Sequence, residues 1–352
     1  MSTVKASWSQ LPAQGAVIEV CQDLPGNLLA SSSLDGEQAY VQIWERDSCT
    51  GDWDLISQVE APSPVSHLAW AHPESGPLLA GGTTAGSVVF WEAPRPLSAC
   101  ARASADDDMQ ESHIREWRQT AEVACGRQPV CALAFGPRQL GLTVATATRG
   151  GCVHVLEADR VMAPNSWTQL SKFQAGAGGA SGASSSATGA AAAAASQGTT
   201  SLCWRPFSPG VAPLLAVAHG ARVEVWQYMQ GVMGWARAAS LPASHPDAPV
   251  SSVHWAPTMG RPCELIAAAR GASVDIVSLT GDTSALATEL LATLEHSAPV
   301  WRLEFNMFGT CLAAATETNL VHLWKPDFVG KWLLVSVVAG SPHAAAEDSE
   351  DS

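Results

Sequence analysis

Charged side chains are scarce in this chain of 352 residues, and most of those present are acidic. Asp, Glu, Lys and Arg make up 15% of the residues, and 19 basic against 33 acidic side chains give a formal net charge of −14. A surface this acidic repels the phosphates of nucleic acids and the headgroups of anionic membranes. We therefore expect no direct binding of nucleic acid and no membrane insertion.

Long apolar runs and paired cysteines are also missing. No window approaches the ~20 apolar residues that cross a bilayer, and the N-terminal stretch lacks the apolar run of a signal peptide. The nine cysteines are odd in number and never spaced C-x-x-C. Reduced, buried thiols in a cytosolic or nuclear protein fit this usage better than a disulfide framework.

Motifs for catalysis or ligand binding are not found either. His67 and His72 are close in sequence, but no neighbouring His or Cys completes a zinc-binding set. Gly330 and Lys331 lack the upstream Gly and the following Ser or Thr of a phosphate-binding loop. We expect that the chain is not an enzyme and that it binds no cofactor and no metal.

What the sequence does contain is a repeat of short apolar strands. One strand type ends in Trp or another bulky residue, and its last residues are Trp44, Trp91, Leu156, Trp226, Val277 and Trp324. These positions are 47, 65, 70, 51 and 47 residues apart, and the two long intervals contain insertions. The underlying period, slightly below fifty residues, is near the ~40–45 residues of a four-stranded propeller blade.

Three further strand types recur around the first. An alternating strand such as VSSVHW begins each unit, and a strand of small residues such as LLAGGT or CLAAAT follows it. A fourth strand opens with Trp, as in WDLISQV and WLLVSVV. Four of the fourteen Trp end third strands, four lie in first strands, five open fourth strands, and only Trp8 is left over. The sequence predicts an all-β, six-bladed WD-repeat-type β-propeller.

The repeat also predicts where the blades begin and end. The six expected blades are residues 17–60, 65–124, 130–173, 200–240, 250–293 and 300–338. Residues 1–16 form an N-terminal segment that could add an edge strand, and residues 339–352 an acidic, disordered tail. The Gly-, Ala- and Ser-rich stretch 175–198 is expected to be a disordered insertion, and residues 93–116 a second long loop.

The blades depart from the usual WD repeat. The Trp-Asp pair that ends the third strand is Trp-Glu at Trp44 and Trp91, Trp-Gln at Trp226 and Trp-Lys at Trp324. The hydrogen-bond network of such repeats therefore cannot be complete in most blades. We expect burial of large apolar side chains, worth ~1.5–3 kcal/mol each, to stabilise the blades instead.

Several stretches carry a resemblance to a known family. AWAHPESGPLLAGG resembles the second blade of the SEC-thirteen-like propellers. FGPRQLGLTVATATRGGCVHVLEADRVMAPNSW and VWRLEFNMFGTCLAAATETNLVHLWKPDFVGKW resemble blades of the nucleoporin branch of that family, the SEH type. The resemblance extends over residues 17–338, and the order and spacing of the motifs are more specific than any one of them.

The resemblance implies a scaffold: an open six-bladed propeller to which an α-solenoid nucleoporin donates a seventh blade in trans. It places the chain at the nuclear envelope, in the Y-shaped subcomplex of the nuclear pore with the other Y-complex subunits, supporting transport of protein and mRNA. It also implies a cytoplasmic or vacuolar pool in a coat-like complex that signals amino-acid supply. The alternatives are a vesicle-coat (COPII) scaffold of the SEC-thirteen type and a closed propeller that acts as a peptide-binding adaptor.

The expected partner site is a gap between the first and sixth blades, because an open ring exposes edge strands and apolar faces. We expect Ile18 and Val20 to line one side and Leu303 and Phe305 the other. Trp8 would anchor an outer strand formed by residues 4–11. The alternative is that this N-terminal strand closes the ring in cis.

Overall fold

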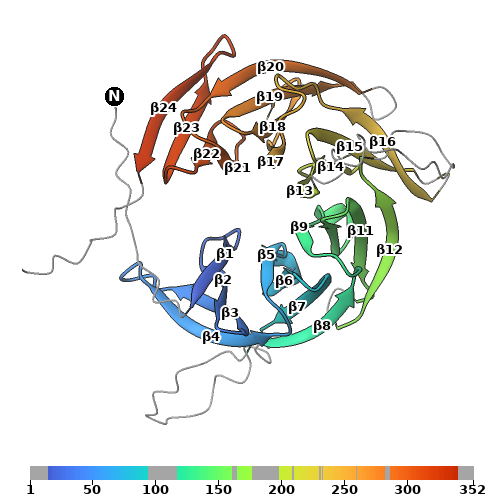
Figure 1. Ribbon diagram of the computed structural model, residues 1–352, viewed down its shortest axis with the longest axis vertical. Coiled ribbons are helices and arrows are strands. Elements are labelled where there is room, and N and C mark those ends of the chain that lie inside the picture. Colours follow the sequence, from blue (N-terminus) through green and yellow to red (C-terminus); the bar gives the residue numbers. More distant parts are fainter. Residues whose placement is uncertain are drawn as a thin grey trace, which may run out of the picture.

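The computed structural model describes residues 15–93, 117–160, 165–176, 198–207, 210–229, 231, 233–258, 260–281 and 286–339. These contain six four-stranded antiparallel sheets arranged around a ring, each made of strands consecutive in the chain (Figure 1). The predicted class, a six-bladed β-propeller, is confirmed. Each sheet is called a blade here and is numbered in chain order.

In every blade the four strands follow one another in chain order from the centre of the ring outward. Blade 1 contains β1 (Ala16–Gln22), β2 (Leu28–Asp35), β3 (Gln38–Arg46) and β4 (Trp53–Ala61). Blade 2 contains β5 (Val65–Trp70), β6 (Leu78–Thr83), β7 (Ser87–Glu92) and β8 (Arg118–Ala124). Blade 3 contains β9 (Val130–Phe135), β10 (Thr143–Thr148), β11 (Cys152–Ala158) and β12 (Trp167–Gln174).

The second half of the ring repeats this plan. Blade 4 contains β13 (Thr199–Trp204), β14 (Leu214–His219), β15 (Arg222–Met229) and β16 (Gly234–Ser240). Blade 5 contains β17 (Val250–Trp255), β18 (Glu264–Arg270), β19 (Ser273–Thr280) and β20 (Ala287–Glu295). Blade 6 contains β21 (Val300–Phe305), β22 (Leu312–Thr316), β23 (Leu320–Pro326) and β24 (Trp332–Ala339). Pro73–Ser75 and Arg138–Leu140 each form a short 3₁₀ helix. No helix among the described residues has the length and apolar content to cross a membrane.

The repeat is visible in the strand registers as well as in the sequence. Every pairing of a first with a second strand has a register shift at the same end, as between Val250 and Ser252 in blade 5. Every pairing of a third with a fourth strand shifts immediately before the bulky third-strand residue, as between Leu323 and Trp324. Such bulges add twist and re-aim side chains, so each blade presents its large residues in the same way.

The small-residue second strands lie deep in the protein. All residues of β6 and β10 are buried, because these strands are covered on both faces by neighbouring blades. Large aromatic side chains fill the spaces farther out: the rings of Phe90 in blade 2 and Trp167 in blade 3 stack with centroids 3.8 Å apart. Core packing between blades therefore holds the ring together.

Polar contacts of the third-strand Trp residues vary from blade to blade, in line with the incomplete WD pattern. The Trp44 indole N–H donates to Ser31 Oγ (3.0 Å), and that of Trp324 donates to His296 Nε2 (3.1 Å). The buried Nε1 atoms of Trp91 and Trp226 have no hydrogen-bond partner among the described residues.

Blade 5 has no Trp at this position and contains a buried ion pair instead. Arg270 Nε donates to Asp275 Oδ2 (3.0 Å), and Asp275 also accepts from Ser244 N and Thr293 Oγ1, each at 3.1 Å. Burial lowers the pKa of Arg270, and the adjacent Asp275 carboxylate opposes that shift. Sequence reasoning missed this network, whose residues do not follow the repeat.

Some expectations concern residues outside the described part of the chain. Residues 1–14, with Trp8, and residues 94–116, 177–197 and 340–352 are among them. The ends of the expected 175–198 insertion do belong to the described structure: Ala175 N donates to Gly151 O (2.8 Å), and Gly220 N donates to Gly198 O (3.3 Å).

Candidate functional site on the first and last blades

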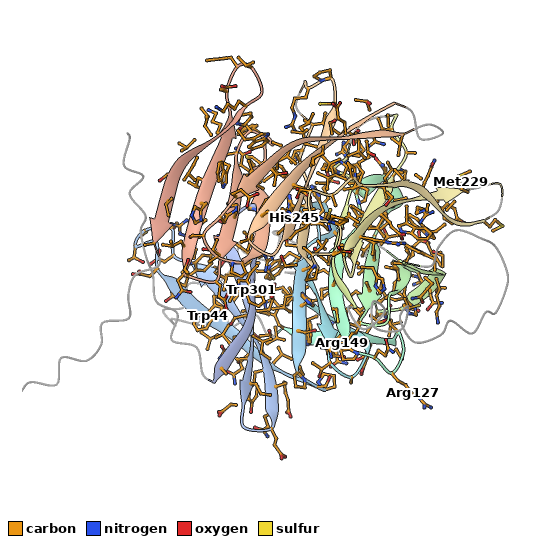
Figure 2. The ribbon with its side chains drawn as sticks, turned by 45° about the horizontal axis from the view of Figure 1, so that its top comes forward. Trp44, Arg127, Arg149, Met229, His245 and Trp301 are labelled. Atoms are coloured by element: carbon orange, nitrogen blue, oxygen red, sulfur yellow. The ribbon has the colours of Figure 1, made fainter. Side chains whose placement is uncertain are left out.

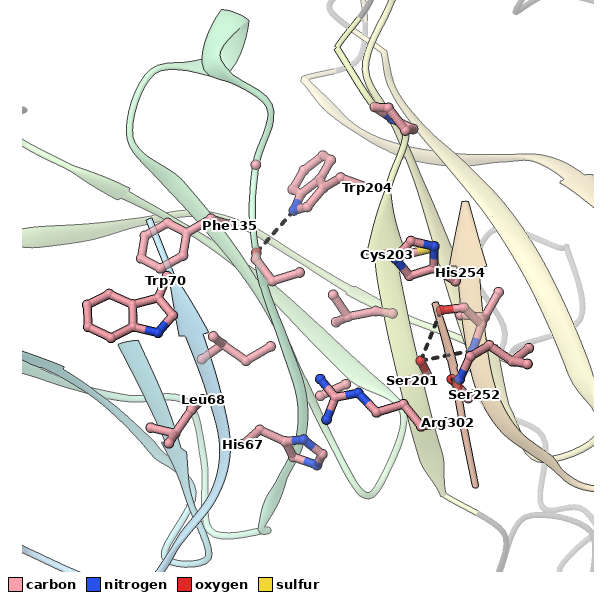
Figure 3. Close-up of a pocket in the computed structure, with 18 of the residues that line it drawn as sticks. His67, Leu68, Trp70, Phe135, Ser201, Cys203, Trp204, Ser252, His254 and Arg302 are labelled. Carbon is pink, nitrogen blue, oxygen red and sulfur yellow. Dashed lines mark hydrogen bonds between the residues drawn. The ribbon is translucent and has the colours of Figure 1, made fainter. Parts of the chain in front are cut away.

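A cavity of about 1220 Å³ lies at the centre of the ring, and Figure 3 shows part of its lining. The innermost strands line it, and Glu19, His67, Trp204, His254 and Arg302 are among its residues. Because the first strand of each blade contributes to this lining, the cavity follows directly from the propeller architecture.

The polar groups around the cavity are used to join neighbouring blades. Ser201 Oγ of blade 4 accepts a hydrogen bond from Val253 N of blade 5 (3.1 Å), and Trp204 Nε1 donates to Ala134 O of blade 3 (3.1 Å; Figure 3). Burial lowers the pKa of His254 to about 4 and raises that of Cys203 to about 12. These groups are therefore uncharged near neutral pH, and the described residues contain no cluster of three or more His, Cys, Asp or Glu that could hold a metal ion.

Apolar clusters join five pairs of neighbouring blades. They lie between blades 1 and 2, 2 and 3, 3 and 4, 4 and 5, and 5 and 6. No such cluster of described residues joins blade 6 to blade 1, and Figure 1 shows their ribbons farther apart than those of other neighbours.

The link observed between blades 6 and 1 is an ion pair at the inner rim. Arg302 Nη1 of β21 lies 2.6 Å from Glu19 Oε1 of β1, with side chains 57% and 16% exposed. The other neighbouring first strands are joined by hydrogen bonds from a hydroxyl or indole side chain to a backbone carbonyl, such as the 2.6 Å hydrogen bond from Ser251 Oγ to Val300 O between blades 5 and 6.

The face of blade 6 that points away from blade 5 is partly open. Ala313 pairs with Leu323, and Ala315 pairs with Val321, so these four side chains share one face. Each is only partly buried. Leu312 and Ala314, on the opposite face, are fully buried in the cluster shared with blade 5.

The face of blade 1 that points away from blade 2 is open along its inner strand. Val17 and Val20 of β1 are 47% and 40% exposed. Ile18, at the register shift of β1, is 43% exposed and lines the central cavity. Trp44 occupies the position that in blade 2 is taken by Trp91, which packs toward blade 1. Trp44 is fully buried, so the exposed part of this face is β1.

Exposed apolar side chains concentrate on these two blades. Of the twenty large apolar residues that are exposed in the described structure, five belong to blade 1 and nine to blade 6. The other four blades together carry six. Exposed apolar surface gathered in one region of a protein typically marks an interaction site.

Two of the predicted site residues do not face the gap. Leu303 and Phe305 are 3% and 4% exposed and belong to the cluster between blades 5 and 6, with Trp332. The physical reason is the alternation of β21: its neighbouring residues Arg302 and Glu304 take the other face. The expectation that Leu303 and Phe305 line the gap is therefore corrected, while Ile18 and Val20 are exposed and Trp8 lies outside the described residues.

Val321 and Leu323 were not predicted from the sequence as site residues. They, and not Leu303 and Phe305, are apolar residues of blade 6 on the face that points away from blade 5. The alignment of one blade with another within this sequence could have identified them. Aligning LIAAAR and SVDIV of blade 5 with CLAAAT and LVHLW of blade 6 puts Val321 and Leu323 opposite Val274 and Ile276. Val274 and Ile276 are the residues with which blade 5 packs on its successor.

The fold defines a class of protein, the six-bladed WD-repeat-type β-propeller. Solved structures support the fold: a chain in the crystal structure of a mitotic checkpoint complex has TM-score 0.58 and 16% identity, covering 88% of this chain and 74% of that one. Sqt1 of Saccharomyces cerevisiae has TM-score 0.59 and 15% identity, covering 92% and 73%.

No family model matches the chain, but curated relatives do. Nucleoporin SEH1 of Xenopus tropicalis is 26% identical over 343 residues, and that of Homo sapiens 24% identical over 342 residues. In both cases the match covers 92% of this chain and 85% of the relative. The chain is thus similar to SEH1 nucleoporins over nearly its whole length, and the resemblance expected from its motifs is confirmed.

Proposed function

We propose that this chain is a structural scaffold subunit of the nuclear pore complex, and that an α-solenoid nucleoporin completes its ring with a donated seventh blade between blades 6 and 1. The observation that carries the proposal is the apolar face of Val321 and Leu323, which is built like the buried face of blade 5 but is left partly open. A blade from another chain would bury it as blade 6 buries its counterpart.

The physical case rests on the cost of leaving such faces in water. Burial of apolar surface contributes roughly 25 cal/mol per Å². Fourteen of the twenty exposed large apolar residues of the described structure belong to blades 1 and 6. Strands added from a partner also satisfy their own backbone groups through hydrogen bonds with one another, as in any blade.

The similarity to SEH1 nucleoporins supports the cellular setting that we propose. The chain would reside at the nuclear envelope, within the Y-shaped outer-ring subcomplex beside other Y-complex subunits, and support passage of protein and mRNA. A cytoplasmic or vacuolar pool in a coat-like complex for amino-acid signalling would use the same two faces. In each setting the chain acts by holding partners rather than by catalysis.

The test is affinity capture of the tagged chain from cells at moderate salt, with mass spectrometry of stoichiometric partners. One variant carries Val20→Asp and Leu323→Asp, which place charges on the two faces of the gap. The matched control carries Leu170→Asp and Leu291→Asp on the exposed outer strands of blades 3 and 5. We expect the wild type and the control to recover an α-solenoid nucleoporin, and the gap variant to lose it.

Other outcomes would overturn the proposal. Recovery of vesicle-coat subunits would assign the chain to a COPII-type scaffold. Undiminished capture by the gap variant would mean that the partner binds elsewhere. A chain that is recovered alone and monomeric, and that needs residues 4–11 for stability, would be a propeller closed in cis, which favours the adaptor function.

A further inference from the structure

The basic side chains of this acidic protein are unevenly distributed over the ring. One face of the ring carries the loops that join successive blades and the turns between second and third strands; we call it the turn face. Four exposed basic residues lie at this face on consecutive elements of blades 2 to 4, and we call them the basic sector: Arg127, Arg149, Lys172 and Arg222. None of them forms an ion pair with a carboxylate among the described residues.

The rest of the turn face is acidic. Six exposed carboxylates lie there, in blades 1, 5 and 6 and in the loop that joins blades 4 and 5: Asp35, Glu37, Glu60, Asp247, Glu295 and Glu317. In blade 4, Glu224 is buried, and its charge is already matched by Arg237 (3.1 Å). In blade 2, Glu122 is exposed and lies two residues before the end of β8, as Lys172 does in β12, so the four basic residues of the sector exceed its exposed carboxylates by three. The turn face therefore has one sector of net positive charge inside a negative surround.

The loops that carry the basic sector are fixed against one another. Arg149 N donates to Pro129 O (2.9 Å), which ties the blade 3 turn to the loop bearing Arg127; Figure 2 shows the two arginines at the same end of the ring. The tie is tight: a Cβ on Gly150 would lie 2.2 Å from Gln128 Oε1. A Cβ on Gly151 would lie 2.8 Å from the His219 ring, three residues before Arg222.

Rigid presentation matters because it lowers the entropy lost on binding. The backbone positions of three arginines are set before a partner arrives. The connection 177–197, which leaves this face from Gly176 and returns at Gly198, contains no charged residue. Its composition therefore cannot neutralise the sector.

We infer that the basic sector is a docking site for a short acidic segment of a partner protein. Opposite charge attracts such a segment and orients it, and paired guanidinium and carboxylate groups form strong, directional hydrogen bonds. The surrounding carboxylates limit the length of the ligand. A continuous polyanion such as RNA would extend beyond four basic side chains onto the acidic part of the face and be repelled there.

The test measures binding of a fluorescent peptide of alternating Glu and Ser to the full chain at about 150 mM salt, by fluorescence anisotropy. The sector variant carries Arg127→Glu, Arg149→Glu, Lys172→Glu and Arg222→Glu. The matched control carries the same change in charge on the opposite face: Arg118→Glu, Arg160→Glu, Lys325→Glu and Lys331→Glu. These four control positions are also exposed and outside any described ion pair with a carboxylate.

We expect the sector variant to bind the peptide about tenfold or more weakly and the control to bind within about twofold of the wild type. A second sector variant has Gln at the four positions, so it removes the positive charges without adding negative ones. It should also lose affinity, which would show that the loss does not depend on misfolding caused by the introduced Glu residues. Equal loss in the sector and control variants would reduce the effect to net charge and overturn the proposal.

Two further arms identify the source of the negative charge. A single-stranded DNA of equal charge should bind more weakly than the peptide; equal or tighter binding would make the sector a nucleic-acid site. Truncation after Ala339 removes Glu347, Asp348, Glu350 and Asp351. If truncation alone raises peptide affinity about tenfold, the tail of this chain occupies the sector, and the assignment to a partner is wrong.

Discussion

The second and third strands of blades 5 and 6 have nearly the same apolar residues on one face, but this face is covered only in blade 5. Ala267, Ala269, Val274 and Ile276 of blade 5 are fully buried against blade 6. Their counterparts are Ala313, Ala315, Val321 and Leu323, and all four are only partly buried. The two faces differ in what lies beside them and not in apolar character.

This comparison shows how a repeat protein can encode a binding site. A terminal repeat normally ends in a polar face, because an uncovered apolar face promotes aggregation. Blade 6 instead keeps the composition of an interior blade. Such a terminal unit is suited to continue the array into another chain, which is the role that we propose for it.

The largest effect on stability is expected when matched residues of the two blades are replaced by Ala. Ile276→Ala should lower the free energy of unfolding by about 2–5 kcal/mol, because it leaves a cavity in a covered core. Leu323→Ala should lower it by about 1 kcal/mol or less, because water already reaches that side chain. Urea unfolding of the purified chain, followed by Trp fluorescence, measures both values.

Val253→Ala, in the core between blades 4 and 5, is the control for an ordinary covered position, since Val253 is 3% exposed. It should behave like Ile276→Ala. If Leu323→Ala costs as much as these two, the open face of blade 6 is covered in the free chain, and the difference between the blades disappears.

The sequence was sufficient for the architecture because the repeat determines it. Bulky third-strand residues, small second-strand residues and Trp-led fourth strands mark each blade. The site was harder to predict, because solvent exposure depends on neighbours that the local pattern does not contain. Leu303 and Phe305 look like any inward-facing pair, and the residues themselves do not show which neighbouring blade such a pair packs against.

The interface between blades 5 and 6 should also be sensitive to acid. His254 Nδ1 accepts a hydrogen bond from Phe305 N (3.3 Å), so the imidazole is neutral in the folded protein. Burial, and then the positive charge of Arg302, lowers the pKa of His254 to about 4, against about 6.5 in the unfolded chain. The unfolded state therefore binds the proton first, and stability falls as the pH drops from about 6.5 to about 4, by at most about 3 kcal/mol.

Unfolding free energies at neutral pH and near pH 4.5 measure this effect. His254→Gln should lose less stability between the two pH values than the wild type. His245→Gln, at an exposed position on the turn face, should lose as much as the wild type. If His254→Gln and the wild type lose stability equally, the imidazole is not buried in its neutral form between these blades.

The smallest effect is expected at the other junction, between blades 6 and 1. Exposed ion pairs contribute about 0.2–1 kcal/mol and are screened by salt, and the Arg302 side chain is more than half exposed. A double-mutant cycle of Arg302→Ala and Glu19→Ala should therefore give a coupling energy below about 1 kcal/mol that vanishes near 1 M NaCl. A coupling of several kcal/mol that persists in high salt would indicate a desolvated contact, so blades 1 and 6 would form a closed interface like the other five. The space proposed for a donated blade would then not exist, because a closed inner rim cannot admit another blade without first breaking that contact.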